Sequence, residues 1–307
     1  MRYVYPRDQG GERAKMDELE PGLRLVRCNN PSPMTFTGTN TYLLGTTEIA
    51  IIDPGPQDMA HLEAILDAVP KGGKITHIFV THSHLDHSPL ARVLADRSGA
   101  PIYAMGDSSV GRSAIMERLS ASGLVGGGEG VDPDFQPDIT LRNGDVIESA
   151  EWQIEAIHTP GHFGNHMSFA TQDIVFTGDH VMGWASSLVS PPDGDLTQFM
   201  ASCEVLKARD ARVFYAGHGD PITDPQARLD WLIAHRRSRE AQIVEAMSAG
   251  PATAGELTKA IYTDVDPRLL PAAERNVLAH LIDLTGRGLA APDGPLSARA
   301  AFALQKP

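Results

Sequence analysis

Four short apolar segments of this chain end in the same way, each delivering a histidine or an aspartate into a turn that is rich in glycine or proline. The four ends lie at residues 78–82, 157–162, 175–179 and 214–218. Short apolar runs bounded by turn residues are typical of buried strands. Because strands position side chains rigidly while the loops after them stay accessible, we expect a fold that gathers these four ends at one edge of its sheets.

The segment from about residue 23 to residue 220 alternates short β-branched or aromatic runs with helical periods, which is an α/β pattern. The predicted strands span residues 40–44, 49–52, 75–80, 101–104, 152–157, 167–170, 174–177 and 212–215. Apolar helical periods cover residues 59–69, 90–94 and 196–206. An Asn-Gly pair in residues 142–145 indicates a tight turn between strands, and residues 171–173 indicate a hairpin. We therefore predict antiparallel pairs mixed with helical crossovers.

After about residue 225 the pattern changes to long helical periods with few strands. A helix that starts at Gln226 is expected to link two domains. Thr253 and Glu256 form a capping-box pattern, and residues 289–304 are expected to pair as a hairpin. Two short helices followed by a hairpin favour a small winged-helix module. The predicted units are an N-terminal extension (1–22), a catalytic domain (23–225), a linking helix (226–248) and a winged-helix-like domain (249–307).

The strand ends supply a large set of metal ligands. The motif His82-Ser83-His84-Leu85-Asp86-His87 carries four of them, and the other three ends add one each. The seven candidates are His82, His84, Asp86, His87, His162, Asp179 and His218. Imidazole and carboxylate donors suit zinc, with iron or manganese as substitutes, and the lack of cysteine among them disfavours a closed structural zinc site. We therefore predict an open catalytic site with two ions about 3.5 to 4 Å apart and a bridging hydroxide as nucleophile.

The motif His-x-His-x-Asp-His, followed in order by a histidine, an aspartate and a histidine, resembles the signature of the metallo-β-lactamase superfamily. The resemblance implies an αβ/βα four-layer sandwich. It also implies a division of the ligands: His82, His84 and His162 on the first metal, Asp86, His87 and His218 on the second, and Asp179 bridging both. Asp53 is implied to orient the ligand loop, and we assign Asp86 and Asp179 as catalytic.

With its C-terminal module, the chain from about residue 23 is similar to the β-lactamase-like protein 2 group of that superfamily. Animal members of the group are single-strand endoribonucleases, and many bacterial relatives are known only as metallohydrolases. The resemblance therefore implies hydrolysis but leaves the substrate open.

Other residues near the ligands are candidates for specificity. His166 and Trp184 are expected to contact the substrate, Trp184 by stacking a base or covering an acyl chain, although a structural hydrogen-bonding role is the alternative for His166. His158 and His180 flank ligands and are expected to support them. Irregular stretches at residues 105–138, which include Gly126-Gly127-Gly128, and at residues 183–195 are either lids over the metals or ordinary surface excursions.

Several residues receive a structural interpretation. His61, His77, His235 and His280 have no partner motif and are expected to be structural. The basic run at residues 235–239 is interpreted as a solvated helix face. Cys28 and Cys203 are expected to be reduced thiols.

The formal net charge is −13, so the average surface repels nucleic acid and anionic membranes. The first twenty residues contain no apolar stretch of the length that a secretory signal needs, and no transmembrane run appears. From these two observations we expect a cytoplasmic protein with no membrane partner.

The leading functional hypothesis is a binuclear zinc-dependent hydrolase that acts on an ester, thioester, lactam or phosphodiester. Three narrower alternatives stay open: a single-strand endoribonuclease of the β-lactamase-like protein 2 type, a hydroxyacylglutathione-type thioesterase and a promiscuous β-lactamase. A metal-sensing, nucleic-acid-binding regulator is the non-enzymatic alternative. The expected partners are a small-molecule substrate or single-stranded RNA, with homodimerisation as a further option for the C-terminal module.

Overall fold

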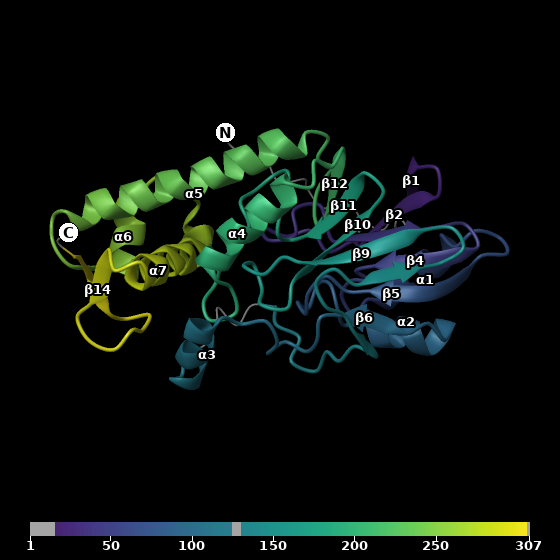
Figure 1. Ribbon diagram of the computed structural model, residues 1–307, viewed down its shortest axis with the longest axis horizontal. Helices are drawn as coiled ribbons and strands as arrows, with labels where there is room; N and C mark the ends of the chain where they lie inside the picture. The colour runs from purple at the N-terminus through teal and green to yellow at the C-terminus, as the bar shows by residue number, and fades with distance from the viewer. Residues whose placement is uncertain (1–15, 125–129, 306–307) are drawn as a thin grey trace.

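The computed structural model describes residues 16–124 and 130–305, which form two large sheets covered by helices and a smaller C-terminal unit (Figure 1). Residues 1–15 of the predicted N-terminal extension and the predicted excursion's Gly126-Gly127-Gly128 lie outside the described residues. Across the two described ranges, no helix combines the length and the apolar character that crossing a membrane would require.

The first sheet contains seven strands in chain order. They are β1 (Met16–Glu20), β2 (Leu23–Arg27), β3 (Asn40–Leu44), β4 (Glu48–Ile52), β5 (Lys74–Phe79), β6 (Ile102–Ala104) and β7 (Ile139–Thr140). Pairs from β1 to β4 are antiparallel and pairs from β4 to β7 are parallel. Because β1 pairs with β2, the last part of the segment assigned to the N-terminal extension belongs to the sheet.

The second sheet has five strands in the order β12-β11-β10-β9-β8. They are β8 (Val146–Glu148), β9 (Gln153–His158), β10 (Met167–Thr171), β11 (Ile174–Gly178) and β12 (Val213–Ala216). The predicted hairpin joins β10 to β11, with Gln172 at a positive φ of 51° in the turn. The Asn-Gly turn also forms, but it carries the chain from β7 of the first sheet to β8 of the second.

Helices cover the outer face of each sheet, which confirms the predicted four-layer αβ/βα sandwich (Figure 1). α1 (Met59–Asp67) and α2 (Leu90–Ser98) pack on the first sheet, and α4 (Leu196–Lys207) and α5 (Pro225–Met247) pack on the second. An aromatic core lies between the sheets, where Phe79 meets Phe169 with ring centroids 5.1 Å apart. Burying each such side chain contributes about 1.5–3 kcal/mol, so this layer holds the two sheets, and the strand ends, in a fixed relation.

The C-terminal unit confirms the predicted winged helix. It comprises α6 (Ala254–Ile261), a 3-10 turn (Pro267–Leu269), α7 (Leu270–Gly286) and a small sheet of β13 (Ala252–Thr253), β15 (Ala301–Leu304) and β14 (Ala290–Pro292). Thr253 and Glu256 form the expected capping box at the start of α6. Residues 105–138 contain a helix that periodicity did not indicate, α3 (Ala114–Ala121), whose Met116 and Leu119 pack into the core of this C-terminal unit.

Candidate metal centre

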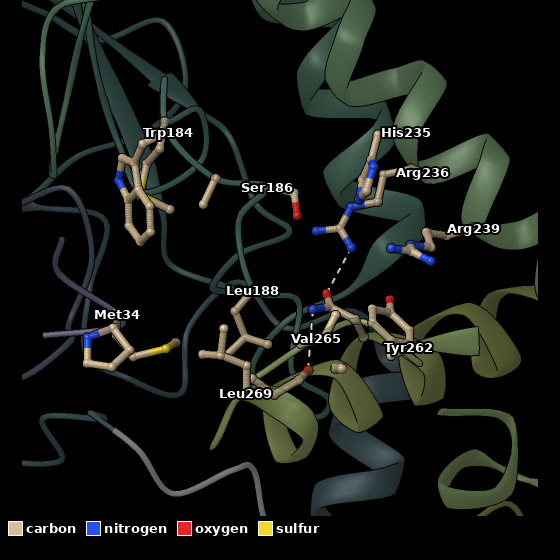
Figure 2. Close-up of a pocket in the computed structure, with 16 residues that line it drawn as sticks. Met34, Trp184, Ser186, Leu188, His235, Arg236, Arg239, Tyr262, Val265 and Leu269 are labelled. Carbon is tan, nitrogen blue, oxygen red and sulfur yellow. Dashed lines mark hydrogen bonds between the residues drawn. The ribbon is translucent and has the colours of Figure 1, made fainter. Parts of the chain in front are cut away.

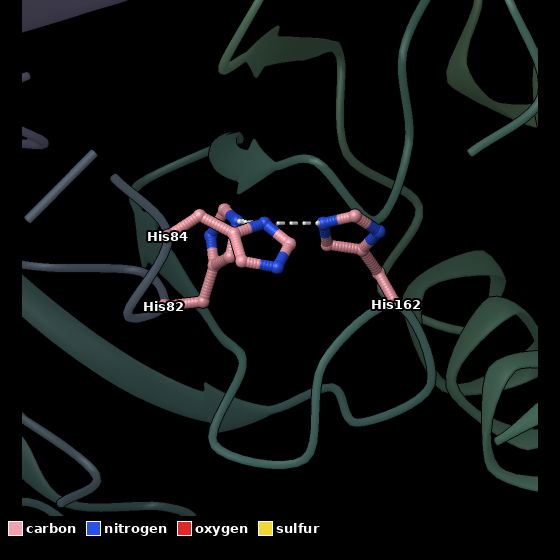
Figure 3. A group of neighbouring side chains, drawn as sticks. All are labelled: His82, His84 and His162. Atoms are coloured by element: carbon pink, nitrogen blue, oxygen red, sulfur yellow. Dashed lines mark hydrogen bonds between the residues drawn. The ribbon is translucent and has the colours of Figure 1, made fainter. Parts of the chain in front are cut away.

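The structure brings all seven predicted ligands together at the ends of β5, β9, β11 and β12. They form two groups, His82 with His84 and His162, and Asp86 with His87, Asp179 and His218. In each group the potential ligand atoms all lie within 4.8 Å of one another. Rings from two separate loops point toward each other in the first group (Figure 3). The expectation that the strand ends converge at one edge is therefore met.

The first group is a cluster of neutral imidazoles. His84 Nδ1 lies 2.9 Å from His82 Nε2 and 3.2 Å from His162 Nε2. The other ring nitrogen of His162 donates to the carbonyl of Leu188 at 2.7 Å, so its Nε2 presents a lone pair to the centre of the group. Burial, reinforced by His162, lowers the pKa of His84 to about 3. Burial likewise lowers the pKa values of His82 and His162, which keeps the group in the form that binds metal.

The second group mixes imidazoles with carboxylates. His87 Nδ1 donates to Asp53 Oδ2 at 2.9 Å, and His218 Nδ1 donates to the carbonyl of Gly38 at 3.2 Å. Both Nε2 atoms therefore turn inward, where they lie only 3.3 Å apart. Burial lowers the pKa of His218, but the carboxylates of Asp179 and Asp86 outweigh burial and raise it to about 9. The carboxylates of this group thus favour positive charge at its centre, which a metal cation can supply in place of the proton.

Asp179 lies between the two groups. One oxygen, Oδ2, is 3.3 Å from His218 Nε2 and 3.9 Å from His162 Nε2. The other oxygen, Oδ1, is 3.4 Å from His87 Nε2, and it is buried without a hydrogen-bond partner among the described residues. A buried carboxylate oxygen left in this way is costly unless a cation meets it. The residues present thus fit a pair of divalent ions that share this carboxylate.

The backbone around the ligands is specialised for close approach. Asp53 adopts a positive φ of 53°, which is unusual for a residue with a side chain. Its Oδ1 accepts from the backbone N–H of Thr81 at 2.7 Å and its Oδ2 from the Thr81 hydroxyl at 2.8 Å, next to the His87 bond. Gly217 has no room for a side chain, because a Cβ there would lie 2.7 Å from His87 Cε1. The hydrogen bonds of Asp53 to Thr81 and His87 therefore hold the ligand loop in place and offset the cost of the Asp53 backbone conformation.

The other predicted site residues lie in different environments. His166 is fully buried, bonds Thr159 Oγ1 at 2.9 Å and lies against Gly178, which fits the structural alternative better than substrate contact. His158 bonds the Gly164 carbonyl at 3.1 Å, and His180 contacts Cys203 at 3.6 Å, so the hydrogen bonds found for these two do not reach a ligand.

Trp184 stacks on Phe36 with ring centroids 4.9 Å apart and lines a pocket of about 250 Å³ (Figure 2). The pocket lies between the catalytic sandwich, α5 and the winged helix, and Leu188 forms part of its wall. Because the Leu188 carbonyl holds His162, the pocket adjoins the first ligand group. Residues 184–186 and 188 of the predicted excursion therefore line the pocket on the side that adjoins the metal centre.

Sequence reasoning missed one residue here and misread another. Arg236 was interpreted as part of a solvated helix face, but only 3% of it is exposed, because α5 packs it over the ring of Phe199. Arg237 and Ser238 are exposed as expected. Asn276 was not singled out, yet its Oδ1 accepts from both Arg236 Nη1 and the N–H of Val189. No local motif marks these residues, since tertiary packing alone brings them to the site.

Comparison with known proteins agrees with the fold and the donor set. Residues 34–218 match the family described as Metallo-beta-lactamase superfamily, and residues 253–295 match the Beta-lactamase associated winged helix domain. The Beta-lactamase-like protein 2 homolog of Drosophila melanogaster is 30% identical over 281 residues, which cover 87% of this chain and 88% of that protein. The Atrochrysone carboxyl ACP thioesterase of Aspergillus fumigatus is 29% identical over 286 residues, covering 86% and 82%.

Among solved structures, a metallo-beta-lactamase family protein from Thermus thermophilus superposes with a TM-score of 0.74 and 26% identity, covering 94% of this chain and all of that one (100%). Together with the donor set, these similarities define a metal-dependent hydrolase. The chain belongs to the metallo-beta-lactamase superfamily, and its predicted similarity to the β-lactamase-like protein 2 group is confirmed.

Proposed function

We propose that this chain is a binuclear, zinc-dependent hydrolase and that its substrates are acyl thioesters or esters. The binuclear proposal is carried by Asp179, whose two carboxylate oxygens face histidines of both ligand groups. We assign His82, His84 and His162 to one ion and Asp86, His87 and His218 to the other, with Asp179 shared. Nitrogen and oxygen donors without sulfur favour catalytic zinc, and iron or manganese are the substitutes.

When bound, such a pair of ions lowers the pKa of a water molecule toward neutrality and polarises the carbonyl of the substrate. The residues of the chain supply orientation. Asp179, with 9% of its side chain exposed, is held between the two histidine groups, whereas 26% of the Asp86 side chain is exposed. Asp86 Oδ2 lies 3.2 Å from His218 Nε2, which fixes the carboxylate at the centre. Because Asp86 is the more exposed of the two carboxylates, it is positioned to orient an attacking water at the open side.

The pocket beside Leu188 supports an acyl substrate. Its walls include the apolar side chains of Met34, Met182, Trp184 and Leu269, and its volume of about 250 Å³ suits an acyl group of several carbons. The net charge of −13 disfavours a polyanionic substrate. Several similar proteins are named thioesterases, including those of Aspergillus fumigatus and Passalora fulva.

Single-strand endoribonuclease activity is the second candidate. It is favoured by the similarity to proteins named Beta-lactamase-like protein 2 homolog and by Arg236 and Arg239, two cationic side chains that line the same pocket. Apolar walls and the acidic surface make it the weaker proposal.

A substrate panel on zinc-loaded protein tests the choice. It compares acetyl and octanoyl thioesters of N-acetylcysteamine, a glutathione thioester, a lactone, a chromogenic cephalosporin and end-labelled single-stranded RNA. We expect the octanoyl thioester to have the highest kcat/KM, to lose turnover after chelation and to recover it when zinc is restored. RNA cleavage without thioester hydrolysis would replace the proposal by the endoribonuclease, and activity that survives chelation would contradict a metal centre.

A further inference from the structure

Arg236 is a buried cation that pairs with no carboxylate in the part of the chain that the structure describes. Its Nη1 donates to Asn276 Oδ1 at 2.8 Å and a second Nη group donates to the carbonyl of Ser187, both of which are neutral acceptors. Its Nε is buried and makes no hydrogen bond, and within the described ranges no Asp or Glu pairs with the guanidinium. Burial lowers the pKa of Arg236 to about 10, so the side chain stays charged near neutral pH.

A buried charge normally pairs with an opposite charge, because desolvation costs several kcal/mol. The two neutral bonds of Arg236 and its position over Phe199, 5.0 Å from the ring centroid, offset only part of that cost. A guanidinium carries five N–H donors, so donors remain for a further acceptor. An anionic group would offset the rest of the desolvation cost.

Arg236 lines the pocket between α5 and the winged helix. Arg239, one turn further along α5, lines the same pocket, and its guanidinium lies 4.3 Å from the ring centroid of Tyr262. Its only hydrogen bond among the described residues is to a neutral acceptor, Gln242. Figure 2 shows both arginine side chains on the α5 side of the pocket, with Leu188 and Met34 across from them. His235 is also in the lining, but burial, together with Arg236, lowers its pKa to about 4 and keeps it neutral.

We propose that Arg236 and Arg239 form a subsite for an oxyanion, a carboxylate or phosphate group carried by the substrate at the end remote from the reacting carbonyl. The inference rests on the proposed function and narrows it to acyl compounds with an anionic far end. The apolar wall at Leu188 and Leu269 holds the connecting carbons, while Leu188 adjoins the metal centre through His162. Guanidinium groups suit this task because they bind carboxylate and phosphate with paired hydrogen bonds.

The test uses three thioesters of equal chain length whose far ends carry a carboxylate, a phosphate monoester or an uncharged carboxamide. Turnover is measured for each, and calorimetry measures binding of the matching thioethers, which cannot be hydrolysed. The variants are Arg236→Gln and Arg239→Gln, with the exposed neighbour Arg237→Gln as matched control. Arg239→Gln keeps the test decisive if Arg236→Gln fails to fold.

We expect at least one anionic compound to bind roughly tenfold more tightly than the carboxamide, since a charge-assisted pair is worth about that much. The ratio should fall toward one in Arg239→Gln and Arg236→Gln and stay unchanged in Arg237→Gln. A purely structural role would change both compounds alike and leave the ratio intact. The anion that binds more tightly shows whether the subsite prefers a carboxylate or a phosphate at the far end of the substrate.

Two failures are distinguishable. Equal binding of charged and uncharged thioethers by the parent protein overturns the anion subsite, even if all three thioesters are hydrolysed. Absence of turnover for all three overturns the proposed thioesterase function, while calorimetry still decides whether the arginines recognise an anion.

Discussion

The metal centre and the interdomain pocket are neighbours, but they are built in different ways. Every candidate ligand of the centre follows a strand of the catalytic sandwich, and four of the seven lie within six consecutive residues. The pocket is lined from residues 33–34, 182–188, 235–239 and 262–276, which are far apart in the chain. Metal binding demands particular residue types at particular spacings, whereas a pocket wall accepts ordinary residues that packing brings together.

Three consecutive residues connect the two regions. The Leu188 carbonyl accepts from His162 at 2.7 Å, on the side of the metal centre. On the other side, the Ser187 carbonyl accepts from Arg236, and the Val189 N–H donates to Asn276 at 3.0 Å. Residues of α5 and α7 thus hold the segment that orients a candidate ligand. Although the two regions are built in different ways, the segment 187–189 connects them physically.

The largest expected effect comes from the carboxylate that both ligand groups share. Asp179→Ala should reduce kcat/KM at least roughly a thousandfold and lower the metal content, because it removes the donor that faces both ligand groups. Metal analysis and thioester turnover measure the two effects. His77→Gln, a half-buried change on β5 outside the ligand set, is the control. Full metal content with full activity in Asp179→Ala would contradict the binuclear assignment.

The same contrast explains what sequence could predict. All eight predicted strands form within about two residues of their expected bounds, because alternating or continuous apolar runs report burial directly. The strands β1, β2, β7 and β8 were not predicted, since their short or mixed-polarity sequences resemble loops. The winged helix was predictable from two short helical periods, the first opened by the capping box at Thr253, and the hairpin pattern that follows them.

Within the site, the ligands carry a spacing signal and their supports do not. His84 and Asp86 are recognisable from their own motif. Arg236 looks like its exposed neighbour Arg237 in the sequence, and only the packing of α5 on Phe199 separates the two. The exposed fraction of a helical residue depends on which neighbouring element covers it, which composition and charge cannot show.

Asn276→Ala tests the connection between the two regions. Loss of its bond to the Val189 N–H should loosen the carbonyl that orients His162 and weaken metal affinity about tenfold, the lower end of such indirect effects. Competition with a chelator measures the affinity, and the exposed Asn29→Ala is the matched control. An unchanged affinity would show that the Asn276 contact does not influence the centre.

A smaller effect is expected at the apolar wall of the pocket. Leu269→Ala removes three carbons from a partly buried position, which should raise the KM of an octanoyl thioester about fivefold relative to an acetyl thioester. The ratio of the two KM values isolates the contact from general damage. Leu289→Ala, a change at a leucine that is 47% exposed and outside the pocket, should leave the ratio unchanged. A similar shift in both variants would remove the pocket as the acyl site.

The smallest expected effect concerns a buried residue of the interdomain region that packs in the core and is not expected to bind a ligand. His280 on α7 is buried, and neither ring nitrogen has a hydrogen-bond partner among the residues described. Burial, with a contribution from Arg236, lowers its pKa from 6.5 to about 3. Since a buried polar group without a partner is costly, His280→Leu should stabilise the fold by about 1 kcal/mol at pH 7, measured by denaturant unfolding.

The pH dependence gives this last variant its sharper test. Below pH 6.5 the unfolded chain protonates His280 while the folded chain keeps it neutral down to about pH 3, so the parent protein loses stability as the pH falls. The slope from this one group approaches about 1.4 kcal/mol per pH unit, and the leucine variant lacks it. Because all other histidines are common to both proteins, the difference in unfolding free energy should widen from pH 7 to pH 5. A constant difference would mean that His280 makes a polar contact in the folded protein and does more than fill space in the core.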